Sequence, residues 1–260
     1  MNWSGKVLLW EEHGLFIGAA GTATLHDSPA IKVCVSLDGG FQLRESEDDP
    51  WVDHTAALIP AGQVHAINGL GNRMAMLLLA PEGELGQVLV QTFAGDGNSA
   101  IHQDVLGEIQ RELNQFSSPD IGFAPGSEIY RTVVKTIAST QPGEEQGTVI
   151  DPRVSQGIDW IRTGRERGIS VGEIATGVEL SESRFSHLFT EHIRVPVRRY
   201  LLWLRLRDAL HMLAGGGSLT DTAHAAGFAD SAHLTRTFRA ALGITPSALV
   251  KESTLVSFLE

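Results

Sequence analysis

The 260-residue chain has a single cysteine, Cys34, and no long hydrophobic run. One cysteine cannot form a disulfide within the chain, which agrees with a reducing compartment. No apolar stretch approaches the roughly 18 residues that a membrane-spanning helix needs, and the first ten residues lack the hydrophobic region and cleavage site of a secretory signal. We therefore expect a cytoplasmic protein without membrane contact, and the length suits two domains.

Positive charge is also scarce, and its distribution bears on nucleic-acid binding. The chain carries 20 Lys and Arg against 31 Asp and Glu. The deficit is confined to residues 1–152, with 7 basic and 20 acidic residues, whereas residues 153–260 hold 13 and 11. Ten arginines and no lysine lie between residues 153 and 207, and arginine suits bidentate contact with phosphate. A merely solvated basic face gives the same count, so charge alone leaves DNA binding open.

Short apolar runs separated by turn residues fill the chain from Trp3 to about Pro81. Their lengths are those of strands, and they are Lys6–Trp10, Leu15–Ile17, Ile31–Leu37, Ala56–Ile59 and Met74–Leu79. Closely spaced short strands with glycine- and proline-containing turns are typical of a β-sandwich or a barrel. We predict a barrel over residues 1–95.

A helical period replaces the strand pattern after Gly95. Apolar residues recur every three or four positions at Ile101, Val105, Ile109, Leu113 and Phe116, and a second helical stretch covers 127–139. We predict a helical hairpin over 96–140 whose apolar stripe joins two chains through residues 100–116. The alternative is that the stripe packs on its own barrel. Residues 141–150, which are polar and rich in helix breakers, are the predicted linker.

Residues 151–252 have the pattern of an all-helical domain of about seven helices. Helix starts are indicated at Asp151-Pro152, at Ser170 with Glu173 in capping-box spacing, at Ser181 and at Pro196. The domain contains an internal duplication, in which 174–189 with 194–195 aligns with 222–238 with 243–244 after one inserted residue.

Each copy of the duplication contains a small alanine, Ala175 or Ala223, followed by a turn, a capping residue and a second helix. The core positions of these second helices are Phe185 and Phe189 in the first copy and Leu234 and Phe238 in the second. A small residue lets two helices cross closely, which is the steric requirement of a helix-turn-helix.

At these residues the chain resembles the AraC/XylS family of transcription regulators. The run Ala223–Arg239, followed by Gly243-Ile244-Thr245-Pro246, is similar to the family signature nearly throughout, and the resemblance extends from Asp151 to Leu249. Ala57–His65 resembles, more weakly, a strand-turn-strand element of the cupin-like barrel that many members carry. The resemblance implies a two-domain α+β protein with a cupin-like barrel and a tandem helix-turn-helix domain, and a sequence-specific DNA-binding regulator controlled by a small molecule.

The family's DNA-binding positions, carried over by the resemblance, fall on Ser183, Arg184, Ser186, His187 and Arg194 in the first copy and on Ser231, Ala232, Thr235 and Arg236 in the second. Arg236 is the predicted direct reader, because a guanidinium pairs with guanine O6 and N7. The serines and Ala232 have an alternative role as small residues that merely permit close approach. For His233 a structural or phosphate-binding role is favoured.

Arg194 stands where the second copy has Gly243, the usual helix-terminating glycine. A left-handed cap is unfavourable for arginine. Either the first helix ends differently, or Arg194 compensates by reaching the DNA backbone.

The N-terminal half has histidines but no recognisable catalytic or metal motif. A metal-binding cupin would need a His-x-His pair followed closely by glutamate, whereas His54 and His65 stand eleven residues apart. A small-molecule site is favoured over an enzyme, with no catalytic residue, metal or cofactor. Its candidate lining residues are Trp10, His26, Cys34, Trp51 and His65.

The expected partners follow from this assignment. They are double-stranded DNA, an unidentified small-molecule effector and a second copy of the chain, with RNA polymerase as a further candidate. A ligand-binding module with vestigial DNA contact is the second hypothesis, and a cupin enzyme is the third.

Overall fold

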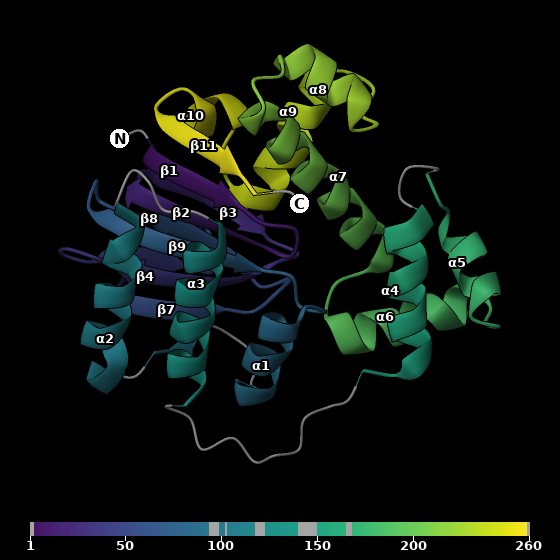
Figure 1. Ribbon diagram of the computed structural model, residues 1–260, viewed down its shortest axis with the longest axis horizontal. Coiled ribbons are helices and arrows are strands. Elements are labelled where there is room, and N and C mark those ends of the chain that lie inside the picture. The colour runs from purple at the N-terminus through teal and green to yellow at the C-terminus, as the bar shows by residue number, and fades with distance from the viewer. Residues whose placement is uncertain are drawn as a thin grey trace.

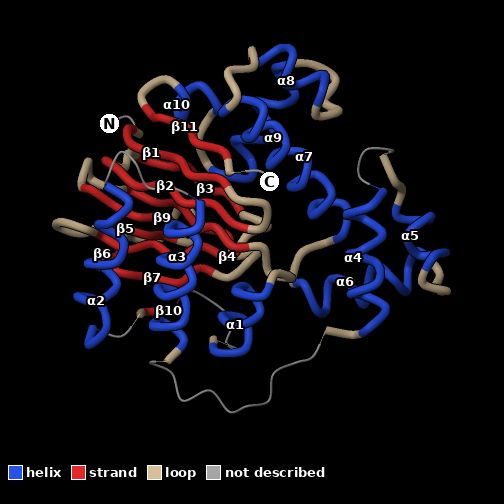
Figure 2. The backbone as a smooth tube through the Cα atoms, in the orientation of Figure 1, coloured by secondary structure: helices blue, strands red, loops and turns tan. Residues whose placement is uncertain are grey.

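The computed structural model describes residues 3–93, 99–101, 103–117, 123–139, 150–164 and 168–258. Within these residues, two sheets and three helices form an N-terminal body, and seven further helices form a C-terminal domain (Figures 1 and 2). None of the described helices is long and apolar enough to cross a membrane.

The larger sheet has the strand order β10-β7-β4-β9-β2-β1-β11, and the smaller has β3-β8-β5-β6. The strands are β1 (Ser4–Leu9), β2 (His13–Ala19), β3 (Thr22–Asp27), β4 (Ile31–Ser36), β5 (Phe41–Arg44), β6 (Val52–His54), β7 (Ala56–Ile59), β8 (Val64–Asn68), β9 (Arg73–Leu79), β10 (Ser99–Ala100) and β11 (Ser253–Ser257). Paired strands are antiparallel, except that β11 is parallel to β1. Phe16, Cys34 and Met76 of the larger sheet share a core with Phe41 and Ile67 of the smaller.

The five apolar runs predicted as strands are confirmed as β1, β2, β4, β7 and β9. The resemblance of Ala57–His65 to a strand-turn-strand element is confirmed by β7 and β8. The prediction misses β3, β5 and β6, because polar residues interrupt these short strands and leave no continuous apolar run. In the described residues the predicted barrel region consists of two sheets that share one core, and the region 1–95 also contains a helix.

Three helices cover the outer face of the larger sheet (Figure 1): α1 (Glu84–Thr92), α2 (Gln103–Asn114), which continues into the 3-10 turn η1 (Gln115–Ser117), and α3 (Phe123–Ala138). The pair α2 and α3 confirms the predicted hairpin. Ile109, Leu113 and Phe116 are fully buried, together with Tyr130 and Val133 of α3. The apolar stripe thus packs within its own chain. It is not exposed, as the predicted contact between two chains through residues 100–116 would require.

The C-terminal domain has the seven predicted helices: α4 (Pro152–Gly164), α5 (Val171–Gly177), α6 (Glu182–Ile193), α7 (Val197–Ala214), α8 (Leu219–Ala225), α9 (Ser231–Leu242) and α10 (Pro246–Val250). The predicted starts are confirmed. Ser170 and Glu173 form a complete capping box, the Ser181 hydroxyl caps α6, and α7 begins after Pro196. Of the predicted linker, only Ile150 lies inside the described residues.

The strand β11 has no counterpart in the sequence prediction. Residues Ser253–Ser257 pair with Gly5–Leu9 and so add the end of the C-terminal domain to the N-terminal sheet. The added strand covers the edge of β1, whose backbone groups would otherwise lack a partner.

Candidate nucleic-acid interface

The two helix-turn-helix units have the same turn. In the first unit, α5 and α6, the amides of Glu179 and Leu180 donate to carbonyl oxygens at 3.1 and 2.9 Å. In the second, α8 and α9, the amides of Gly227 and Phe228 donate to the equivalent carbonyl oxygens at 3.1 and 2.8 Å. The duplication predicted from sequence is therefore a duplication of backbone geometry.

Helix caps and core positions also repeat between the units. The Ser181 hydroxyl accepts from the Arg184 amide at 3.3 Å, and the Asp230 carboxylate accepts from the His233 amide at 2.6 Å. The predicted core residues of α6 and α9 are fully buried, and Ala175 and Ala223 lie buried at the helix crossings. The second helix of each unit is thus fixed on its inner side and open on its outer side.

The predicted DNA-binding positions lie on those outer sides. Six of these side chains are exposed (Ser183, Arg184, His187, Arg194, Ala232 and Arg236), whereas Ser186, Ser231 and Thr235 are partly buried. The Thr235 hydroxyl donates to the Ser231 carbonyl at 2.8 Å, which orients its methyl group. Within the described residues, the ion pairs leave the Arg184 and Arg236 guanidinium groups free for phosphate or base.

Arg194 has the left-handed backbone that its alignment with Gly243 implies. The φ angles are 65° at Arg194 and 73° at Gly243, and each residue's amide bonds to the carbonyl four positions earlier. The first of the two alternatives, a different helix end, is therefore wrong. A second such position was not predicted: Glu179 has φ 56° where the second unit has Gly227 at 76°. The residue alignment itself contains the signal that would have found it.

A single long helix carries both units. Figure 1 shows α5 and α6 at one end of α7 and α8 and α9 near the other. Trp203, Leu204, Leu206 and Leu210 of α7 are buried, so both units are packed onto one rigid element.

The second unit is seated directly on the N-terminal body. The amide and hydroxyl of Thr24 in β3 donate to the Gly243 carbonyl at 3.0 and 3.1 Å. An ion pair joins Arg199 of α7 to Asp27, and the Tyr200 hydroxyl donates to the buried carboxylate of Glu82. The end of α9 is thus held against the edge of the smaller sheet.

A cluster of one lysine and two histidines, Lys32, His26 and His65, lies between the sheets, close to this contact. The buried Lys32 amine lies 2.9 Å from His65 Nε2 and also contacts His26 Nε2. His26 Nδ1 lies 2.7 Å from the Thr24 carbonyl, and His65 Nδ1 lies 2.8 Å from the Gln63 carbonyl. Because a carbonyl only accepts, both Nδ1 atoms carry the proton and both Nε2 atoms accept from Lys32.

Burial sets the protonation of this cluster. It lowers the pKa of Lys32 to about 7 and, together with the Lys32 charge, lowers that of His26 to about 3 and that of His65 well below its usual value. Burial also raises the pKa of Cys34 to about 12, so this cysteine remains an unreactive thiol. At pH 7 the cluster is two neutral imidazoles around an amine that is about half protonated.

A cavity of about 50 Å³ lies beside the cluster. Its walls are apolar apart from Lys32 and come from both halves of the chain: Trp3, Val7, Leu9, Gly14, Leu15, Phe16, Ala23, Ile67, Met76 and Leu78 from the body, and Leu210, Leu242, Ile244 and Leu249 from the C-terminal domain. An occupant would contact the sheets and the end of α9 at the same time.

The five candidate effector residues do not form one site. His26 and His65 lie together, with ring centroids 4.2 Å apart, and Cys34 is buried in the same core. Trp10 packs beneath α2 and α3 on the other face of the larger sheet, and Trp51 lies under the Arg44 guanidinium near the surface.

Sequence reasoning missed Lys32, although period-two alternation along β4 puts it on the same face as Cys34. Within the described residues, His, Cys, Asp and Glu form no group of three that would suit a metal ion.

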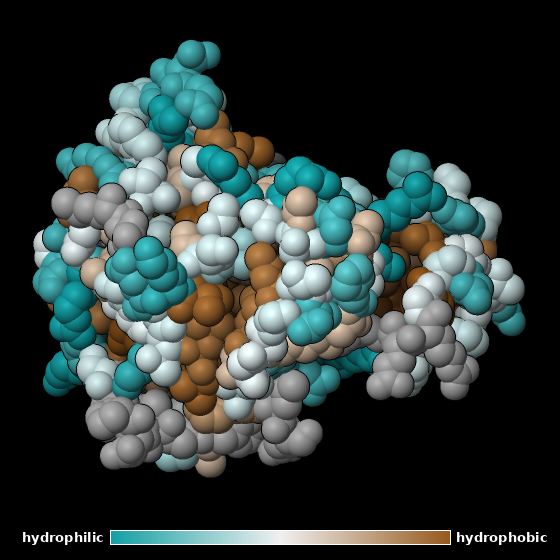
Figure 3. All heavy atoms as spheres, turned by 90° about the horizontal axis from the view of Figure 1, so that it is seen from above, coloured by the Kyte–Doolittle hydropathy of each residue, from teal (hydrophilic) through white to brown (hydrophobic). Residues whose placement is uncertain are grey.

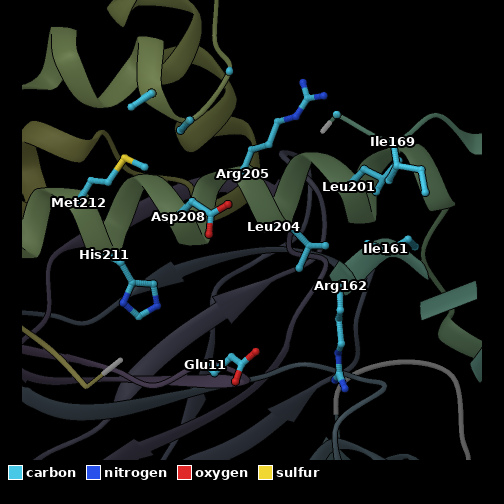
Figure 4. Close-up of a pocket in the computed structure, with 14 residues that line it drawn as sticks. Glu11, Ile161, Arg162, Ile169, Leu201, Leu204, Arg205, Asp208, His211 and Met212 are labelled. Carbon is cyan, nitrogen blue, oxygen red and sulfur yellow. The ribbon is translucent and has the colours of Figure 1, made fainter. Parts of the chain in front are cut away.

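A larger recess lies on the other side of α7. It measures about 720 Å³ and is lined by Ile161 and Arg162 of α4, by Leu201, Leu204, Arg205, Asp208, His211 and Met212 of α7, and by Glu11 of the body among others (Figure 4). Figure 3 shows hydrophobic side chains gathered in the hollow between the larger body and the smaller lobe. Glu12 pairs with Arg162 at 2.5 Å beside it.

Comparison with known proteins supports the helical domain most directly. A family model described as a helix-turn-helix domain matches residues 174–252. The transcriptional activator RhaS of Yersinia pestis is 29% identical over 111 residues, which are 42% of this chain and 39% of that protein. RhaS of Pectobacterium carotovorum is 30% identical over 93 residues, which are 35% and 33% of the two chains. The chain therefore spans about two fifths or less of the length of these curated relatives.

Solved structures extend the similarity of fold to both halves. ToxT from Vibrio cholerae superposes with a TM-score of 0.60 at 10% identity, covering 93% of this chain and 98% of that one. A structure of ToxT with an unsaturated fatty acid bound has a TM-score of 0.54 at 13% identity, covering 92% and 93%. These matches show a shared two-domain fold. The helix-turn-helix domain of this chain is thus similar in sequence to that of the RhaS transcriptional activators, and both halves share the fold of ToxT.

Proposed function

We propose that the protein is a sequence-specific DNA-binding transcription regulator controlled by a small molecule bound in its N-terminal body. The observation that carries the proposal is the pair of helix-turn-helix units with matching turns, caps and cores, each with an exposed outer side on its second helix. The RhaS relatives are named as transcriptional activators, which supports the same role here.

DNA reading is assigned to α6 and α9. Each helix presents about one turn of side chains, a length that suits three or four base pairs of a major groove, and the two units would read segments about ten base pairs apart. Arg236 is the strongest reader, because its free guanidinium can pair with guanine, and Ala232 and Thr235 can contact a thymine methyl group. Arg184 and Arg194 are assigned to phosphate. Pairing of two chains on DNA and contact with RNA polymerase stay predictions.

The effector site is assigned to the cavity beside Lys32. The ToxT structure with a bound unsaturated fatty acid shows that a protein of this fold binds such a small molecule. In this chain, Leu242 and Leu249 form part of the cavity wall, and His26, which contacts Lys32, lies against Gly243 at the end of α9. A ligand that binds one arrangement of this wall more tightly than another would shift the position of the second unit.

The test is selection of bound sequences from a random DNA pool, followed by Arg236→Ala on the enriched site. We expect Arg236→Ala to weaken binding by about 1 to 3 kcal/mol and to relax preference at one base pair. Arg111→Ala, at an exposed position on α2, is the matched control and should leave affinity unchanged. A pool without enrichment would favour the second hypothesis, a ligand-binding module with vestigial DNA contact.

A further inference from the structure

Lys32 is a buried amine whose described contacts include no carboxylate. Its side chain is 1% exposed between the sheets, and its polar partners are the Nε2 atoms of His26 and His65. A buried ammonium normally requires an anionic partner, because desolvation of an unpaired charge is costly. The position therefore favours the neutral amine.

The two imidazoles also orient the amine. Both Nε2 atoms accept, because both Nδ1 protons are donated to backbone carbonyls. A neutral amine has two hydrogens, and the two histidines take both. One direction around the nitrogen, that of its lone pair, is then left without a hydrogen bond. Lys32 also lines the cavity, whose other walls are apolar.

We propose that Lys32 captures a small aldehyde as an imine, so that the cavity is a reversible covalent sensor of carbonyl compounds. This inference rests on the proposed effector cavity and names the chemistry of its ligand. Neutral lysine in an apolar pocket is the form that adds to carbonyl carbons. Burial keeps about half of the Lys32 amine neutral at pH 7, because its pKa is about 7.

The reaction balances without an external oxidant or reductant. The Lys32 lone pair forms a bond to the carbonyl carbon, and a proton from the nitrogen passes to the carbonyl oxygen through an imidazole Nε2. Loss of the resulting hydroxyl group with a second nitrogen proton releases one water and leaves a carbon–nitrogen double bond. Hydrolysis reverses each step and restores the free amine.

The size of the cavity limits the aldehyde. A volume of about 50 Å³ corresponds to roughly three to five water-sized positions. Butanal fits this limit, and its propyl tail would meet Leu242 and Leu249 of the C-terminal domain. A longer aldehyde would have to separate these leucines from the sheets.

The experiment treats the full chain with butanal and cyanoborohydride at pH 7, which reduces an imine to a stable secondary amine, and locates the label by peptide mass spectrometry. The chain has only four lysines, and the exposed Lys135 and Lys251 serve as internal controls. We expect Lys32 to be labelled at least about tenfold faster than these two. Lys32→Met should remove that label and leave theirs. Equal labelling of the three lysines in the wild-type chain, or labelling of Lys135 and Lys251 alone, would overturn the proposal, whatever the variant's stability.

Matched ligands separate this inference from the proposed function. Butanol has the same chain without a carbonyl carbon, and butyrate replaces the aldehyde with an anion. If butanol or butyrate changes affinity for the selected DNA as butanal does and no Lys32 adduct forms, the imine is disproved and small-molecule control stands. If the adduct forms but DNA affinity is unchanged, the imine stands and effector control through this cavity fails.

Discussion

The two helix-turn-helix units share a backbone but differ at the two positions where that backbone is left-handed. The second unit has glycine at both, Gly227 and Gly243, whereas the first has Glu179 and Arg194. Left-handed backbone costs roughly 1 to 2 kcal/mol for a residue with a side chain. The close helix crossing therefore fixes the geometry of the motif, and the first unit keeps that geometry at a local cost in stability.

The surroundings of the two helix ends explain part of the difference. A Cβ on Gly243 would lie 2.6 Å from both His26 Nδ1 and the Thr24 carbonyl oxygen, so the seat on the sheet excludes any side chain there. The Arg194 side chain is exposed and has room to reach a DNA phosphate. Both helix ends lie against the body, because a Cβ added to Gly62 would lie 3.0 Å from the Arg194 carbonyl oxygen. They differ in that Gly243 has no room for a side chain, whereas the Arg194 side chain is exposed.

The largest effect that would test this difference is expected from Gly243→Ala. The added methyl group meets backbone and an imidazole while the φ angle of 73° remains unfavourable, so we expect a loss of about 3 kcal/mol in the free energy of unfolding. Gly216→Ala is the matched control, because Gly216 has φ 87° and nothing within 4 Å of an added Cβ. It should lose only about 1 kcal/mol. Urea unfolding measures both losses. Equal losses would show that the contact of Gly243 with the smaller sheet adds nothing to the destabilisation.

A smaller effect on the free energy of unfolding is expected from pH, through the Lys32 amine in the core beneath the second unit. The pKa of Lys32 is about 7 in the folded chain against 10.5 ordinarily, so the unfolded chain binds more protons between these values. Stability should then rise with pH above 7, by about 2 kcal/mol between pH 7 and 9, and the full penalty should be present below pH 7. The lowered pKa values of His26 and His65 change the free energy of unfolding only below about pH 6.5, outside this window.

Lys32→Met provides the reference for that measurement, because it keeps the size and removes the charge. The difference in unfolding free energy between Lys32→Met and the wild-type chain should shrink as the pH increases from 7 to 9. A constant difference across this range would mean that the Lys32 amine keeps its ordinary pKa and has a partner that the cluster does not supply.

The tandem units could be predicted from sequence because their determinants are local. Ser170, Ser181 and Asp230 each cap a helix whose first turn lies within the next three residues. The pairs Phe185 with Phe189 and Leu234 with Phe238 repeat at helical spacing, so their burial follows from the helix itself.

The contact of the second unit with the N-terminal body could not be predicted in the same way, because it joins segments that are distant in the chain. β11 pairs with β1, about 250 residues earlier in the chain, and a five-residue segment with only two large apolar side chains shows no clear strand pattern. The burial of Lys32 depends on the smaller sheet, whose strands are short and polar. Likewise the apolar stripe of α2 indicates a buried face but does not identify the surface that covers it.

The smallest effect is expected from exchanging the left-handed residues themselves. Glu179→Gly should stabilise the chain by about 0.5 kcal/mol, because relief of the left-handed strain exceeds the entropy that glycine adds to the unfolded state. Gly227→Glu is the reverse exchange in the second unit and should destabilise by a similar amount, since the nearest atom to an added Cβ lies 3.9 Å away.

Arg194→Gly separates strain from function at the other left-handed position. It should raise the unfolding free energy by the same small amount as Glu179→Gly. It should also lower DNA affinity and reduce the salt dependence of binding by about one phosphate contact. If affinity and salt dependence stay unchanged, Arg194 has no DNA contact to offset its backbone strain, and the first unit would then be the weaker copy of the second without a compensating function.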